Sequence, residues 1–196
     1  MMDKRDIALQ LSCPVLPVPI FSEFVQASRY GERILVASNG VFIEVTRKWG
    51  RFIRRIGDVA VTVPYGEIQP STSFTLPSLP RELLQEFNQL AKKNCNVEIG
   101  ASIVWNEISN TFRLLPAQSL EATSDRLKYQ LAQFEDGEHL VVDCHSHGAH
   151  KAFFSSEDDF DDRDMVKFSY VVGNCDREQV STSLRLCVKG IFEIIF

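Results

Sequence analysis

Residues 145–158 read HSHGAHKAFFSSED, and this stretch decides how the C-terminal part of the chain is interpreted. His145 and His147 are separated by one residue, and Ser155 and Asp158 follow in the pattern Ser-x-x-Asp. A hydrolytic zinc ion needs three protein ligands and one open position for water, and two imidazoles with one carboxylate supply that set. The stretch therefore predicts a catalytic zinc site with His145, His147 and Asp158 as ligands.

The histidines follow an apolar run, residues 140–144, which predicts a strand that ends at the motif. Side chains two positions apart in a strand project from the same face, so His145 and His147 are expected to face one metal ion. Cys144 and Ser146 should then point to the opposite side. A His-x-His pair by itself is weak evidence, because such histidines are more often half-buried structural residues, and the prediction depends on the third ligand.

Ser155 and Asp158 have a second interpretation. Ser-x-x-Asp is also a helix capping box, in which the serine bonds a backbone amide three residues later and the acid bonds back. A helix is expected over residues 155–166, since its acidic first turns suit a helix N-terminus. Both interpretations hold together, because a capped helix start is a rigid platform for a ligand. Ser156 and Asp159 repeat the pattern one residue later and remain an alternative.

Other functional interpretations of the chain have less support. A zinc set of His145, His147 and His150, as in metallo-β-lactamase-like hydrolases, needs an aspartate where Ala149 stands and further histidines downstream, which are missing. Residues 158–164 lack the glycine and alternating oxygen ligands of an EF-hand, so a solvated acidic helix face is expected there. A basic cluster is interpreted as a solvated hairpin face rather than a site for an acidic partner; it comprises Arg47, Lys48, Arg51, Arg54 and Arg55.

The composition of the 196 residues is that of an ordinary globular protein, with 44% hydrophobic and 24% charged residues. The net charge of -5 gives no electrostatic footprint for nucleic acid. No stretch approaches the roughly 20 apolar residues that cross a membrane. The five cysteines are scattered and contain no Cys-x-x-Cys pair, which favours a reducing compartment. We expect a cytoplasmic protein with neither nucleic acid nor membrane as a partner.

A proline-rich segment suggests a division of the chain into residues 1–79 and residues 80–196. The first thirty residues, with three prolines, are expected to be extended and irregular. Asn39-Gly40 between apolar runs predicts a hairpin, and short strands over 51–56 and 59–63 should follow. Four prolines between residues 64 and 80 then favour a surface connector. The N-terminal region is thus predicted to be small and β-rich.

The second part alternates helices and strands. An apolar stripe with acidic residues at its start and basic residues at its end predicts a helix over residues 81–93. A β pair is expected over 97–105 and 111–115, and 127–134 is ambiguous between helix and strand. Strands after the motif are expected over residues 168–172, 184–188 and 191–196.

This order of elements, with His145-Ser146-His147 followed by Ser155 and Asp158, resembles the JAMM motif of MPN or JAB domain metallopeptidases. These are zinc isopeptidases that include deubiquitinases. The resemblance covers residues 80–196 and implies an α+β, three-layer-like fold related to cytidine deaminases, in which helices flank a mixed β-sheet. More narrowly, the chain is similar to the bacterial branch called PRTRC system protein A. Its members stand beside an E1-like (ThiF-type) protein and a small ubiquitin-like protein.

The resemblance assigns a role to each residue of the motif. The ligands of the family's Zn²⁺ ion correspond to His145, His147 and Asp158. The family's serine, here Ser155, donates a hydrogen bond to the oxyanion of the tetrahedral intermediate. Its general base is a glutamate near the start of the strand after the first helix, and this chain has Glu98 at that place.

Two departures from the family pattern bear on these roles. Gly100 follows Glu98 one residue earlier than in the family's usual Glu-x-x-Gly-like opening, and Gly148 stands where many members have proline. The first departure leaves Glu107 and Glu121 as alternative bases. The second concerns the stiffness of the loop more than the binding of metal.

The sequence thus predicts a zinc-dependent peptidase that hydrolyses an amide or isopeptide bond. The resemblance implies the C-terminus of a ubiquitin-like protein as its substrate. The alternative, from a different class, is a non-catalytic MPN-type scaffold or protein-binding module, because some relatives keep the fold without turnover. Loss of ligands distinguishes the two, and here all the motif positions are filled.

Overall fold

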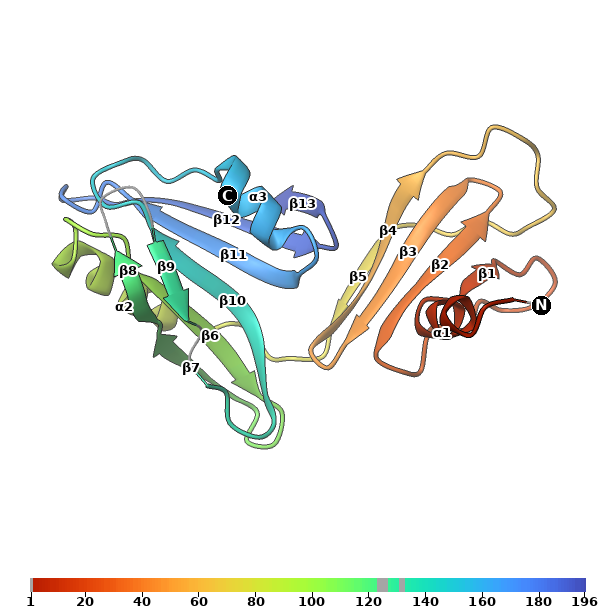
Figure 1. Cartoon of the computed structure of the whole chain (residues 1–196), viewed down its shortest axis with the longest axis horizontal. Coiled ribbons are helices and arrows are strands. Elements are labelled where there is room, and N and C mark those ends of the chain that lie inside the picture. The colour runs from red at the N-terminus through yellow and green to blue at the C-terminus, as the bar shows by residue number, and fades with distance from the viewer. Residues whose placement is uncertain (1, 123–126, 131–132) are drawn as a thin grey trace. The chain divides into compact units, whose positions relative to one another are not determined.

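The computed structural model describes residues 2–122, 127–130 and 133–196, with the side chains of 118–132 left aside. The chain forms two compact units, Met1–Thr75 and Leu76–Phe196. Each unit has a β-sheet of its own, and the sheets and helices are drawn in Figure 1. None of the helices in the described residues is long and apolar enough to cross a membrane.

The first unit is built on a five-stranded sheet in the order β1-β2-β3-β4-β5. Strand β1 runs parallel to β2, and the other neighbours are antiparallel. The Asn39-Gly40 hairpin between β2 and β3 is confirmed. One face of the sheet carries an apolar core of Val18, Leu35, Ala37, Phe42, Ile53 and Ile68. The elements are α1 (Lys4–Ser12), β1 (Val15–Pro17), β2 (Gly31–Ala37), β3 (Gly40–Arg47), β4 (Gly50–Gly57) and β5 (Ser71–Phe74).

Three expectations for this unit were wrong. The first thirty residues contain the helix α1, because Asp3 caps it by accepting a hydrogen bond from the Arg5 amide and the first proline comes only after the helix. Residues 59–63, all of them described, form no strand, since β4 pairs with β5 instead. Strand β5 itself lies in the segment that was predicted to be a connector, where its exposed Ser and Thr side chains gave no apolar signal.

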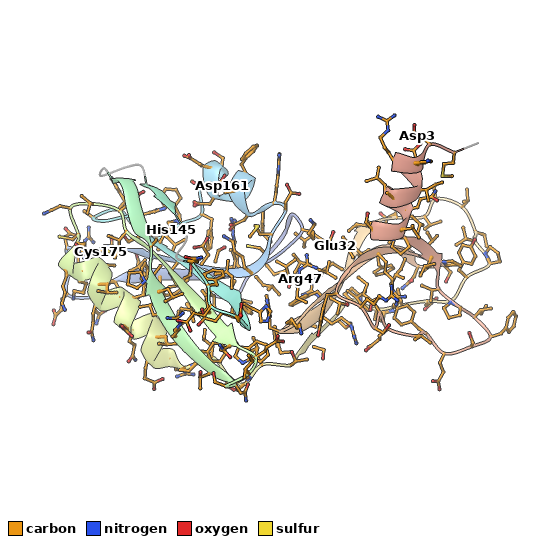
Figure 2. All side chains as sticks on the ribbon, turned by 60° about the horizontal axis from the view of Figure 1, so that its bottom comes forward. Asp3, Glu32, Arg47, His145, Asp161 and Cys175 are labelled. Carbon is orange, nitrogen blue, oxygen red and sulfur yellow. The ribbon has the colours of Figure 1, made fainter. Side chains whose placement is uncertain are left out.

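The basic cluster is paired within its own unit and is not simply a solvated face. Arg47 forms an ion pair with Glu32 at 2.7 Å, and Figure 2 labels both side chains. Arg54 is buried and donates to the carbonyl of Ser71 at 2.7 Å. These arginines therefore stabilise the sheet and its edges.

The second unit contains a six-stranded mixed sheet in the order β13-β12-β11-β10-β6-β7. Strands β10 and β11 are parallel, and all other neighbours are antiparallel. A separate pair, β8 (Gln118–Ala122) and β9 (Leu127–Gln130), precedes β10. The sheet strands are β6 (Gly100–Asn106), β7 (Thr111–Pro116), β10 (Glu138–Ser146), β11 (Val166–Gly173), β12 (Ser181–Val188) and β13 (Ile191–Ile194). Together with the helices they confirm the predicted α+β class.

Two helices cover opposite faces of this sheet (Figure 1). Helix α2 (Arg81–Lys93) packs on the face of β11 that carries Tyr170, whose hydroxyl donates to Asn88 at 3.0 Å. Helix α3 (Ser156–Asp162) lies on the other face, where Asp162 meets Lys167 and Ser169 of the same strand. The odd and even positions of β11 thus point to different helices. The helix predicted over 155–166 is shorter than expected, and the strand predicted from residue 97 begins at Gly100.

Candidate metal centre

The two histidines stand at the end of β10. His145 is its penultimate residue, and the His147 amide extends the pairing with β11 by donating to the Val172 carbonyl at 2.8 Å. The Nε2 atoms of the two rings are 3.1 Å apart. Cys144 and Ser146 are fully buried on the opposite side, so the predicted alternation of side chains is confirmed.

The loop after the histidines is seated tightly on the neighbouring strands. Gly148 has a φ of +53°, a conformation that proline is unable to adopt, so a proline would not fit at this position of the loop. A Cβ atom at Gly173 would lie 2.2 Å from the carbonyl oxygen of His150. The amide of Asn174 donates to that carbonyl at 2.6 Å. Backbone contacts that only glycine permits therefore fix the path from the histidines to α3.

Ser155 and Asp158 form the capping box at the start of α3, so the second interpretation of this pair is confirmed. The Asp158 amide donates to Ser155 Oγ at 3.2 Å, while the Ser155 amide and hydroxyl donate to Asp158 Oδ2 at 2.7 and 2.6 Å. The other carboxylate oxygen, Oδ1, faces His145 Nε2 at 3.3 Å. The cap thus holds one oxygen of Asp158 and leaves the other directed at the histidines.

The three predicted ligands come together. One ligand atom from each of His145, His147 and Asp158 lies within 4.8 Å of the others. Ligand atoms on a tetrahedral zinc ion, at about 2.0–2.1 Å from the metal, are about 3.3 Å from one another. The separations of 3.1 Å and 3.3 Å measured from His145 Nε2 to the other two ligand atoms match that spacing. The donor set therefore fits a zinc ion.

The protonation of His147 suits metal binding. Burial, followed by the nearby His145, lowers the pKa of the His147 imidazole from its usual 6.5. The ring also forms a hydrogen bond with the backbone of Lys151, the kind of contact that fixes the orientation of a ligating histidine. The lowered pKa favours the neutral imidazole, which is the form that binds a metal ion.

The register of β6 against β10 brings Glu98 to the same place. Gly100 pairs with His145, and the Ser146 amide donates to the Ile99 carbonyl at 2.9 Å, so the chain before β6 runs beside the histidines. Glu98, the histidines and Ser155 all line one cleft of about 470 Å³. Figure 2 labels His145 on β10 and Asp161 on α3, two of the elements that line it.

The alternatives occupy other positions. Glu107 lies 3.6 Å from His139 and is not among the residues that line the cleft. The side chain of Glu121 lies outside the described residues. His150 lines the cleft but is not part of the ligand cluster found among the described residues. Asp159, from the pattern shifted by one residue, points away and pairs with Arg185.

A group of charged residues that lies near the histidines was not predicted from the sequence. Asp143, Lys167 and Ser169 line the cleft together with Asp162, and Arg185 lies behind them. Burial raises the pKa of the Asp162 carboxyl, but the ammonium of Lys167 and hydrogen bonds outweigh this and lower it below its usual value. Polar residues at alternate positions of otherwise apolar strands were the available signal, since Asp143 lies two residues before His145.

Comparisons with known proteins place the second unit in a family. No curated protein matches the chain. Among solved structures, the chain is similar to the solution structure of protein DSY2949 from Desulfitobacterium hafniense, with 14% identity, a TM-score of 0.45, and coverage of 58% of this chain and 86% of that chain. Residues 3–75 match a domain of unknown function, DUF2016. Residues 80–187 match the model for prokaryotic homologs of the JAB domain.

The last match spans more than half of the chain and coincides with the unit that carries the ligand cluster. The chain therefore belongs to the family of prokaryotic homologs of the JAB domain.

Proposed function

We propose that the protein is a zinc-dependent peptidase that hydrolyses an amide or isopeptide bond. The observation that carries this proposal is the convergence of His145, His147 and Asp158, whose ligand atoms lie within 4.8 Å of one another, in a cleft that Glu98 and Ser155 also line. When bound, zinc supplies Lewis acidity and lowers the pKa of a coordinated water toward about 7. The remaining steps belong to the side chains of the chain itself.

Glu98 is the proposed general base. Its carboxylate would take a proton from the attacking water and pass it to the nitrogen of the leaving amine, as a positioned acid or base does in both directions of a proton transfer. Its side chain lines the cleft, whereas that of Glu107 does not, and this supports the choice of Glu98 over Glu107. A half-buried position at the end of the loop before β6 gives it access to substrate.

Ser155 is the proposed oxyanion donor. Its hydroxyl now donates to Asp158 Oδ2 at 2.6 Å, and rotation about its χ1 would direct the same hydrogen at the oxygen of a scissile carbonyl. The Ser155 amide would keep its own bond to Asp158 meanwhile, so the ligand would stay oriented while the hydroxyl serves the substrate. One serine would thus cap the helix and stabilise negative charge.

We further propose that the substrate is a ubiquitin-like protein joined through its C-terminus, and that the chain belongs to the PRTRC system protein A branch. The motif resemblance supports this, and an E1-like, ThiF-type partner would accompany it. Residues 3–75, which match a separate domain model, would then be available to receive a partner. The competing function is a non-catalytic scaffold of the same family.

The test compares Glu98→Gln with wild type on a ubiquitin-like protein whose C-terminus is amide-linked to a fluorophore. The expected result is about one zinc per chain in both proteins, measured by elemental analysis, and cleavage reduced at least about 100-fold in the variant. Glu107→Gln is the matched control and should cleave normally. Zinc binding without any cleavage by wild type would favour the scaffold, and normal cleavage by Glu98→Gln would remove this residue from the mechanism.

A further inference from the structure

Helix α3 carries a proposed zinc ligand but has almost no apolar anchor. It has seven residues, too few to be stable by itself. Its single large apolar residue, Phe160, is 62% exposed, and Asp162 is its only buried residue. Something other than apolar packing must hold the helix on the sheet.

Arg185 of β12 binds the side of α3 that faces the sheet. Its side chain is buried, and its guanidinium lies 4.0 Å from the ring centroid of Phe154 and 4.1 Å from that of Phe192. It forms ion pairs with Asp159 and with Asp162, the latter at 2.9 Å. Two aromatic rings thus fix the plane of a guanidinium whose two ends bind two carboxylates of α3.

Lys167 of β11 completes the network. Its buried ammonium lies 2.7 Å from Asp162 Oδ1 and also pairs with Asp143. Ser169, two residues further along β11, donates to Asp162 Oδ2 at 2.6 Å. Asp143 precedes His145 by two residues on the same face of β10, so the network joins the helix to the strand that carries the histidines.

The spacing within α3 links this network to the metal site. Asp158 and Asp162 are four residues apart, which places them on one face of the helix, one turn from each other. Asp158 faces His145, and Asp162 is held by both cations. A helix that is fixed at Asp162 by ion pairs and at Ser155 by its cap has little freedom to move Asp158.

We propose that Arg185 and Lys167 are positioning residues that set the place of Asp158 by holding α3 on the sheet through ion pairs. This rests on the proposed function to the extent that Asp158 is a zinc ligand. The ion pairs act in place of an apolar anchor, and their loss lets α3 shift while the sheet and the two histidines stay in place.

The test measures the zinc affinity of the full chain by competition with a chromogenic chelator. Arg185→Lys keeps the positive charge but is unable to bind Asp159 and Asp162 at the same time through two separate N–H groups. We expect the zinc affinity of this variant to fall about tenfold, the smallest effect that is usual when a residue supporting a metal ligand is changed. Arg163→Lys is the matched control, because Arg163 sits at the end of α3, where it forms an ion pair with exposed Asp164 and contacts the exposed ring of Phe160. Its affinity should equal that of wild type. Asp159→Asn, whose residue is exposed, should weaken binding less than Arg185→Lys.

A double-mutant cycle separates positioning from general destabilisation. In an Asp158→Ala background, measured against a weaker chelator, Arg185→Lys should change zinc affinity less than twofold, because its effect passes through Asp158. Hydrogen exchange of the metal-free variant should be faster at the amides of α3 and unchanged in β10. Equal fold-changes in both backgrounds, or wild-type affinity and exchange in Arg185→Lys, would overturn the inference. A wild-type protein that binds no zinc would instead refute the proposed function, while the exchange experiment would still test the role of Arg185.

Discussion

The two helices of the second unit are attached to the same sheet by different forces. Helix α2 is 13 residues long and buries Phe87 and Ala91 against the sheet. Helix α3 has seven residues and buries only Asp162, which is held by cations. Apolar burial tolerates small shifts, whereas buried ion pairs demand defined geometry and are weak stabilisers overall. The comparison indicates that α2 stabilises the fold, while α3 places side chains at the candidate metal centre.

The largest effect is expected on the α2 side. Phe87→Ala removes a fully buried ring that packs edge-on against Tyr170, with centroids 6.4 Å apart. The free energy of unfolding should fall by about 3–5 kcal/mol because of lost burial and the cavity left behind. Urea unfolding of the metal-free protein measures this. Gln89→Ala, on the exposed side of the same helix, is the control and should change stability by less than about 0.5 kcal/mol. If Phe87→Ala lowered the zinc affinity as much as Arg185→Lys does, the proposed difference between the roles of α2 and α3 would be wrong.

Ser155→Ala probes the start of α3 and should separate stability from catalysis. Loss of the cap should cost about 1 kcal/mol of unfolding free energy. If Ser155 is the oxyanion donor as proposed, its loss should lower kcat about 100-fold, corresponding to about 3 kcal/mol. Ser156→Ala is the matched control in both thermal unfolding and cleavage assays, because the exposed Ser156 side chain lines the same cleft but does not cap the helix. If both variants lost kcat equally, Ser155 would have no special role.

The contrast between the helices also explains which features the sequence predicted. Helix α2 was found because its apolar residues recur at helical spacing, a local signal. The length of α3 was overestimated because the acidic run was expected to continue the helix to residue 166, whereas β11 already begins at Val166. The ion pairs of Asp159 and Asp162 were missed because their partner Arg185 comes from a distant strand. Helix α1 was missed because none of its residues is buried, so no apolar stripe marks it.

The site shows the same limit. The positions of the histidines and of the acid follow from a short motif on one strand end and one helix cap. Glu98 lies in the cleft because β6 pairs with β10 in a register that sets Gly100 opposite His145. These two strands are far apart in the sequence, and their register is not predictable from either stretch alone. Local patterns thus predicted the elements and the ligand types, and long-range pairing decided which other charges join them.

The pH dependence of stability tests the burial of His147. Since the pKa of its imidazole is lower in the folded protein than its usual 6.5, the unfolded chain binds the proton more readily. The contribution to stability is therefore fully present above pH 6.5 and is lost as the pH falls through the folded pKa. Chemical unfolding of the metal-free protein between pH 8 and pH 5 should show this decline, and His147→Gln should show a smaller one. An identical decline in both proteins would assign the effect to other groups.

Phe160→Ala should have the smallest effect, and it tests directly whether α3 needs an apolar anchor as α2 does. The ring lies on the exposed side of α3 and contacts the guanidinium of Arg163 at 4.1 Å, a surface contact of about 0.5 kcal/mol. If ion pairs rather than apolar packing hold the helix, neither the unfolding free energy nor the zinc affinity should change by more than that amount. Thermal unfolding and chelator competition measure both quantities, with Phe87→Ala as the reference for an apolar anchor. A loss near that of Phe87→Ala would show that α3 depends on its one aromatic residue after all.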